Sequence, residues 1–188
     1  AGIGCEQSFP EALFWYRQAA ERGHLRAVCN LAECYVHGRG TEESPEQAFS
    51  LYWQAAERGH AHAIFRLAVF RRLGYGCEAD PEEAFRLFQQ AAAQGHSGAQ
   101  CELGIAYERG RGVERNPEEA VKWYQIASKQ GDLCATYNLG WCYESGYGVK
   151  RDLKKAAYLY RVTAEHGDID GQTSLGWCYR YGIGVPKN

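Results

Sequence analysis

Several features of ordinary proteins are missing from this chain of 188 residues, and two of these absences exclude a class of function. There is no methionine, and there are only 5 prolines. No apolar run approaches the roughly 20 residues that cross a bilayer, so we expect no membrane span. The 21 basic and 23 acidic residues give a formal net charge of −2. This balance offers no electrostatic reason to bind nucleic acid.

Glycine is abundant instead, with 22 residues, and its placement is periodic. A glycine followed by His or Asp recurs every 36 residues without insertion or deletion, at Gly23, Gly59, Gly95, Gly131 and Gly167. A period between about 20 and 50 residues indicates a solenoid, in which each repeat buries its apolar face only against its neighbours. The spacing therefore predicts one continuous array without an internal domain boundary.

Each repeat begins with the signals of a helix start. Ser44-Pro45 is an example, with a side-chain oxygen that accepts from free amides at the N-cap and a proline at the first helical position. Small and aromatic residues then follow at helical spacing, as in Ala48 and Tyr52. Gly59 fits the left-handed residue that ends such a helix.

A second helix follows each of these glycines, and the His or Asp opens it. Its middle carries a pair such as Leu139-Gly140, whose small residue lets two helices approach closely. A Gly-x-Gly loop such as Gly38/Gly40 closes the unit and requires positive φ twice. The pattern predicts an all-α solenoid of five helix-turn-helix repeats, preceded by the loop of a truncated unit, over residues of about 9–44, 45–80, 81–116, 117–152 and 153–188.

The ends of the chain lack the features of a natural start and finish. The sequence opens within a loop at Gly2–Gly4 and closes within the matching loop at Gly182–Val185. Solenoids usually need polar capping units, and Trp177, Cys178 and Tyr179 do not resemble a cap. We therefore expect the parent protein to extend beyond one or both ends.

The cysteines do not fall into repeat-matched pairs. Equivalent positions in neighbouring repeats lie on the order of 10 Å apart, beyond the roughly 7 Å limit between the Cα atoms of a disulfide. We predict no disulfides, and this usage favours a reducing, cytoplasmic compartment. Paired C-x-x-C elements and zinc-like Cys–His patterns are absent, so we predict no metal site and no cofactor. The cysteines are Cys5, Cys29, Cys34, Cys77, Cys101, Cys134, Cys142 and Cys178.

Signatures of catalysis are also absent. Neither G-x-S-x-G nor S-x-x-K occurs in the sequence. His60 and His62 are two residues apart, so a helix does not place both rings on one face. The paired acids Glu82 and Glu83 fall in a first helical turn, where compensation of the helix dipole explains them. We predict that the chain is not an enzyme.

The repeat unit resembles the Sel-like repeat, a relative of the tetratricopeptide repeat, over essentially the whole chain. The resemblance implies a right-handed α/α superhelix of antiparallel helix pairs and an adaptor or scaffold role. A cysteine-rich, secreted branch of the family carries one disulfide per unit, but its positions are occupied here by pairs such as Ala20 and Val28. The matching residues of one unit are Glu119, Ala120, Tyr124, Ala127, Gly131, Asp132, Ala135, Leu139, Gly140, Tyr143, Gly146, Gly148 and Val149.

Candidate binding residues lie on the second helices. The resemblance implies that these helices line the concave side. The residues two positions before and two positions after the repeated leucine should face the groove, together with a residue further along the same stripe. Tyr, Trp and Arg are enriched at binding hot spots, which places the centre at Tyr137, Trp141 and Trp177. Packing within a tightly coiled superhelix would explain the same aromatics, and both interpretations stay open. The predicted lining is Phe65, Val69, Arg72, Cys101, Ile105, Glu108, Tyr137, Trp141, Glu144, Thr173, Trp177 and Arg180.

The function predicted from these residues is a non-enzymatic scaffold or adaptor that binds a peptide or a partner's helix in this groove. Trp141 and Trp177 would act as anchors, and Arg72 and Arg180 as charged contacts. Two alternatives stay open. One is a structural segment that self-associates through the exposed ends of the array. The other is a module that binds glycans or small molecules, with the same aromatics stacked on sugar rings.

Three further tryptophans lie in the first helices. Leucine occupies the positions equivalent to Trp15 and Trp123 in the other repeats, so both are predicted to pack between helices. Polar residues occupy the positions equivalent to Trp53, so Trp53 is predicted to be an exposed aromatic.

Overall fold

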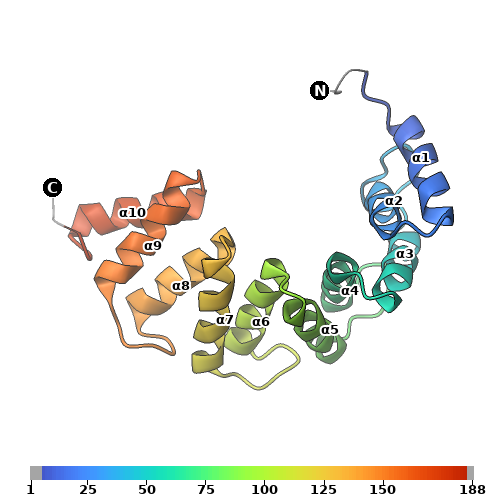
Figure 1. Ribbon diagram of the computed structural model, residues 1–188. Coiled ribbons are helices and arrows are strands. Elements are labelled where there is room, and N and C mark those ends of the chain that lie inside the picture. Colours follow the sequence, from blue (N-terminus) through green and yellow to red (C-terminus); the bar gives the residue numbers. More distant parts are fainter. Residues whose placement is uncertain (1–5, 186–188) are drawn as a thin grey trace. The chain divides into compact units, whose positions relative to one another are not determined.

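The computed structural model describes residues 6–185, and all regular structure in that range is α-helical (Figure 1). This architecture confirms the predicted all-α repeat solenoid. Cys5 and the opening loop Gly2–Gly4 lie outside the described residues. The helices are α1 (Phe9–Glu21), α2 (Leu25–His37), α3 (Pro45–Glu57), α4 (Ala61–Leu73), α5 (Pro81–Ala93), α6 (Ser97–Arg109), α7 (Pro117–Lys129), α8 (Leu133–Ser145), α9 (Leu153–Glu165) and α10 (Ile169–Tyr181).

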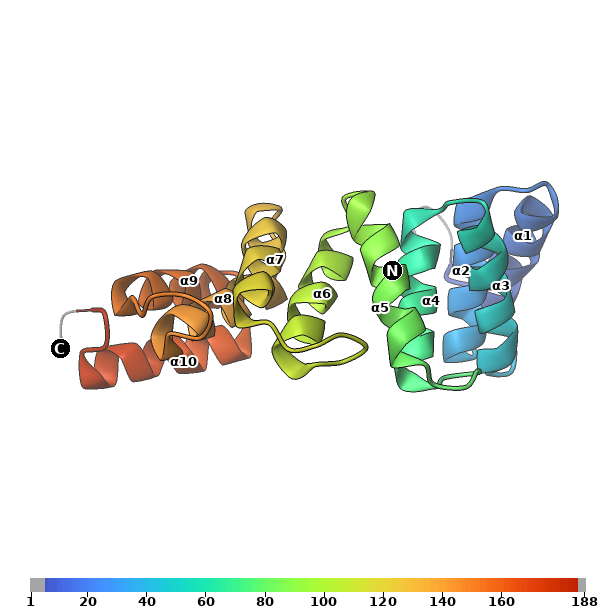
Figure 2. The ribbon, with the colours of Figure 1, turned by 90° about the horizontal axis from the view of Figure 1, so that it is seen from below.

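The helices belong to two compact units, residues 1–94 and 95–188. In the first unit each of the helices α1 to α4 packs on the helix that follows it, and α2, α3 and α4 lie side by side (Figure 2). In the second unit α6 to α10 pack in the same sequential way, and α6 also contacts α8. The apolar core is therefore a series of small clusters between neighbouring helices. One of them joins α6, α7 and α8 around Tyr124 and Leu139.

Helix starts follow the predicted caps. The Oγ atom of Ser44 accepts from the amide of Gln47 at 3.4 Å, and α3 begins at the next residue. At the second helices, Nδ1 of His60 accepts from the amide of Ala63 at 3.3 Å. These bonds satisfy amides that a helix leaves without a partner in its first turn. The histidines that open second helices are therefore structural caps, as predicted.

The Gly-x-Gly loops need their second glycine for space as well as for conformation. Gly40 has φ of 75°, and a Cβ atom there would lie 2.6 Å from the carbonyl oxygen of Phe9. Gly76 similarly lies against Pro45, the first residue of α3. Each of these loops thus folds back onto the start of the first helix of its own pair, where no side chain fits.

Small residues in the second helices allow close approach to the next first helix, as predicted. A Cβ atom on Gly104 of α6 would lie 2.4 Å from a ring carbon of Tyr124 in α7. The equivalent atom on Gly140 of α8 would lie 2.8 Å from the ring of Tyr160 in α9. The rings of Tyr124 and Tyr160 therefore rest directly on the glycine backbone of the preceding second helix.

This contact predicts opposite effects of one substitution at two equivalent positions. Gly104→Ala should lower the free energy of unfolding by about 1–3 kcal/mol, because the new methyl group overpacks against Tyr124. Gly176 of α10 has nothing within 4 Å of such a methyl group. Gly176→Ala should instead stabilise by about 0.5–1 kcal/mol through helix propensity. Urea unfolding followed by circular dichroism measures both, and a shift of the same sign in the two variants would contradict the packing argument.

One prediction about the tryptophans is wrong. Trp15 is 67% exposed rather than packed between helices, although Trp53 is exposed as predicted. The reason is that α1 contacts α2 through the face carrying Leu13. Trp15 lies off that face and packs edge-on against Phe14, with 5.2 Å between ring centroids. Trp123 is half-buried.

Candidate partner-binding face

The predicted binding residues all lie on second helices, three on each of α4, α6, α8 and α10. In the first unit, Phe65, Val69 and Arg72 of α4 are half-buried. The ring of Phe65 lies 6.0 Å from that of Phe88 in α5. This part of the predicted lining is therefore partly occupied by packing within its own unit.

The prediction that Cys101 lines the groove is wrong. Its side chain is 4% exposed and belongs to the core cluster between α6, α7 and α8. The offset of two residues from Leu103 does not bring it to the surface, because the buried face of α6 is wider than the leucine stripe alone. Ile105, one turn further along α6, packs partly against the same cluster.

Two acids predicted to line the groove bind buried tyrosines. The hydroxyl of Tyr124 donates to Oε2 of Glu108 at 2.6 Å, and that of Tyr160 donates to Oε2 of Glu144 at 2.7 Å. Burial and these hydrogen bonds to carboxylates raise the pKa of both phenols. The acids therefore have a structural role, because a buried hydroxyl without a partner would be costly.

In the first unit, a different acid accepts a hydrogen bond from the buried tyrosine. The hydroxyl of Tyr52 donates to Glu33, whose carboxylate also lies 3.2 Å from the guanidinium of Arg66. At the equivalent of Tyr52 in the next repeat stands Phe88, which has no hydroxyl to satisfy. The residue 16 positions before Phe88 is Arg72 rather than an acid. The acids of the second helices thus accompany the tyrosines that need them.

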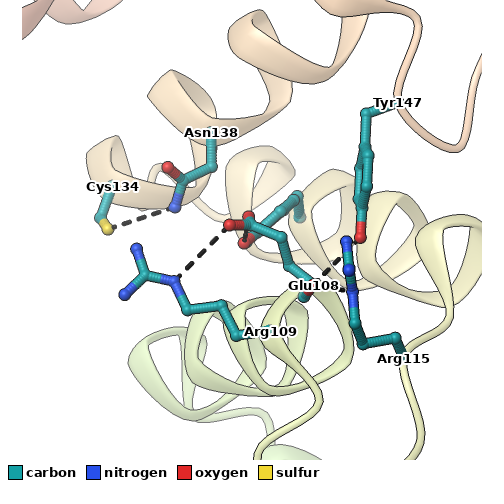
Figure 3. A network of polar contacts seen from close by, with 7 residues as sticks. Glu108, Arg109, Arg115, Cys134, Asn138 and Tyr147 are labelled. Carbon is teal, nitrogen blue, oxygen red and sulfur yellow. Dashed lines mark hydrogen bonds and ion pairs between the residues drawn. The ribbon is translucent and has the colours of Figure 1, made fainter.

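Glu108 also anchors the loops beside it (Figure 3). Its backbone oxygen accepts from the hydroxyl of Tyr147 at 3.1 Å and from Nε of Arg115 at 3.0 Å. Its carboxylate lies 3.6 Å from Nε of Arg109. Tyr147 in turn packs against Trp141, with 5.2 Å between ring centroids. The orientation of Trp141 is therefore supported by a hydrogen-bonded loop.

Helices α8 and α10 meet at a polar contact. The hydroxyl of Tyr137 lies 3.3 Å from Oγ of Ser174, which joins the two helices. Trp141 and Trp177 each lie about one helical turn further along from this pair. Trp141 is 39% exposed and Trp177 is 54% exposed, so both indoles offer apolar surface.

Trp177 is held in place by its own neighbours on α10. It stacks on Tyr181 with 5.0 Å between centroids, and the guanidinium of Arg180 lies over both rings. Thr173, the remaining predicted residue of this helix, is exposed. We name Tyr137, Trp141, Trp177, Arg180 and Tyr181 the aromatic face. Of these residues, Tyr181 was missed because it stands one position beyond Arg180, the last residue with the predicted spacing from the repeated leucine.

Apart from the aromatic face, a group of two cysteines and one aspartate lies between α6 and the start of α8. The sulfur atoms of Cys101 and Cys134 and a carboxylate oxygen of Asp132 all lie within 4.8 Å of one another. The hydrogen bond between the two thiols lowers the pKa of Cys134 and, together with burial, raises that of Cys101. All seven cysteines within residues 6–185 are free thiols. Sequence spacing did not indicate this group, because 33 positions separate the two cysteines.

Comparison with known proteins identifies the repeat. The Sel1 repeat matches residues 1–24, 25–60, 61–96, 97–132, 135–168 and 169–188. The chain belongs to the Sel1 repeat family. It is similar to the crystal structure of a Sel1 repeat protein from Oxalobacter formigenes, with 32% identity and a TM-score of 0.92 over all of this chain and 75% of that one.

Two further Sel1-like structures extend the comparison. The chain is 35% identical to c5321, a protective antigen present in uropathogenic Escherichia coli strains, with a TM-score of 0.90. The match covers 100% of this chain but only 40% of that protein. The immunity protein Pa5087 from Pseudomonas aeruginosa is 28% identical, with a TM-score of 0.64 over 89% of this chain and 62% of that one. No protein of curated function matches the chain in sequence.

Membership of the Sel1 repeat family supports the coarse functional prediction. Proteins of this family are generally non-catalytic scaffolds that mediate protein interactions. None of the helices within residues 6–185 combines the length and apolarity that a membrane crossing requires. The arrangement around Trp141 and Trp177 offers apolar contact surface, which suits binding rather than acid–base chemistry.

Proposed function

We propose that this chain is a non-enzymatic scaffold that binds an extended peptide or a helix of a partner protein on the aromatic face. The observation that supports this proposal most strongly is the exposure of two indoles on successive second helices, 39% for Trp141 and 54% for Trp177. Tyr147 and Tyr181 pack against these rings and orient them. Rigid aromatic surface that is already oriented loses little entropy on binding.

The same contacts suggest which kind of partner segment would fit. Apolar side chains of the partner would cover the indoles, which gains about 25 cal/mol for each Å² removed from water. Within residues 6–185, Arg180 contacts the rings of Trp177 and Tyr181 and forms no ion pair. An acidic residue of the partner would supply one. We therefore propose a segment that combines apolar residues with an acidic one.

Removing both indoles should abolish most of the affinity. Peptides selected from a random display library against the intact chain provide a ligand, and fluorescence anisotropy of the labelled peptide measures its dissociation constant. The double variant Trp141→Ala/Trp177→Ala should bind at least about 30-fold more weakly, because one hot-spot side chain contributes about 2 kcal/mol or more. Circular dichroism should show equal helicity in both proteins.

Trp53 provides the matched control for this experiment. It is 41% exposed, close to the value for Trp141, but it lies on the first helix α3. Trp53→Ala should leave the dissociation constant unchanged. The aromatic face is not the binding site if the double variant keeps its affinity for the peptide. The same conclusion follows if Trp53→Ala loses as much affinity as the double variant. Arg180→Glu adds a charge test, because it should weaken acidic peptides more than neutral ones.

A further inference from the structure

The group formed by Cys101, Cys134 and Asp132 has the composition of a metal site. Cys101 comes from the middle of α6, whereas Asp132 and Cys134 lie at the start of α8 in the same unit. Their two sulfur atoms and one carboxylate oxygen lie within 4.8 Å of one another. Sulfur and carboxylate ligands bind Zn²⁺ at about 2.3 Å and 2.0–2.2 Å, so tetrahedral ligand atoms stand roughly 3.5–3.8 Å apart. Each distance between these atoms must therefore shorten by no more than about 1.3 Å to reach this spacing.

The charges around the group favour a cation over a free pair of thiolates. The negative charges of Asp132, which belongs to the group, and of Glu102, which follows Cys101 in α6, would repel two thiolates formed there. A divalent cation would offset this repulsion, because thiols lose their protons to solvent when they bind metal. The amide of Asn138 donates from Nδ2 to the sulfur of Cys134 at 3.7 Å (Figure 3). This bond orients the exposed ligand from outside the site.

We propose that Cys101, Cys134 and Asp132 bind a thiophilic divalent cation of the zinc class, which links α6 to the start of α8. Three protein ligands leave a fourth position for water or for a ligand atom of a partner. Asp132 can serve two purposes, because its Oδ1 atom caps α8 by accepting from the amide of Ala135 at 2.8 Å. A carboxylate has a second oxygen for the metal. The site is independent of the aromatic face.

Cobalt(II) is the probe for the test, because its bonds to thiolates absorb intensely in the near ultraviolet. The full chain is reduced, treated with a chelator, freed of both reagents and titrated with Co²⁺. We expect a single site with thiolate-to-cobalt absorption, displacement by Zn²⁺ and a raised midpoint of thermal unfolding, because a ligand specific for the folded state stabilises it. Cys134→Ser, an exposed substitution, should weaken binding by at least about 10-fold, the scale on which even supporting residues act.

Two variants separate metal binding from simple structural damage. Asp132→Asn should also weaken binding while keeping the helix cap, because Asn116 already caps α7 through Oδ1 at 3.0 Å from the amide of Glu119. Cys77→Ser, which changes a loop cysteine of the other unit, should leave binding unchanged. The proposal fails if Co²⁺ produces no thiolate absorption, or if Cys134→Ser binds as tightly as the parent. Formation of a Cys101–Cys134 disulfide under hydrogen peroxide, without cobalt binding, would assign a redox-sensitive pair instead.

Discussion

Replacement of Tyr124 by alanine should lower the free energy of unfolding by about 4 kcal/mol, within the 3–5 kcal/mol typical of buried aromatic residues. Tyr124 is 0% exposed and lies in the core cluster that joins α6, α7 and α8. Its ring rests on Gly104, so no neighbouring side chain there can move into the space. The truncation also leaves Glu108 without its hydroxyl donor. Urea unfolding followed by circular dichroism measures the loss.

Tyr124→Phe separates the ring from its hydroxyl. This variant keeps the packing against Gly104 and removes only the bond to Glu108, so it should cost about 1.5 kcal/mol, the lower end for bonds to charged groups. The lower end applies because the Glu108 side chain is 20% exposed and water can reach its carboxylate. Phe88 shows that the repeat accepts phenylalanine here when no acid accompanies it. Equal losses in the two variants would mean that the hydroxyl, rather than ring packing, carries the stability.

The helices could be predicted from the sequence because their signals are local. Ser44 and His60 cap helices through amides three residues away, and Gly59 adopts its φ of 78° at the turn between them. Such interactions involve neighbouring residues and recur at the same place in each repeat. The period therefore repeats the same local evidence along the chain, which makes the element boundaries unusually clear.

The partners of side chains across the repeats could not be predicted in the same way. The period indicates which helix carries Glu108, but not that its carboxylate reaches a phenol 16 residues later in α7. The position of the leucine likewise does not indicate how wide the buried face of a helix is. The spacing from the leucine therefore predicts that Cys101 faces the groove, although its side chain is buried. Its proximity to Cys134 appears only in three dimensions.

Gly148→Ala should destabilise the chain by about 3–5 kcal/mol, which is large for the addition of one methyl group. Gly148 has φ of 62°, a conformation that costs other residues about 1–2 kcal/mol. A Cβ atom there would also lie 2.1 Å from the carbonyl oxygen of Pro117. That oxygen belongs to the backbone of the first residue of α7, so relief of the clash requires movement of the helix start or of the loop.

Gly131→Ala isolates the conformational part of this cost. Gly131 has φ of 85°, but nothing lies within 4 Å of an added Cβ atom. Its replacement should therefore cost only about 1–2 kcal/mol. Thermal unfolding measures the difference, because 1 kcal/mol shifts the midpoint by about 2–4 °C in a chain of this size. Similar midpoints for Gly148→Ala and Gly131→Ala would show that the loop can move away from Pro117 at little cost in free energy. A much lower midpoint for Gly148→Ala would mean that contact between loop and helix start requires glycine at this position of the repeat.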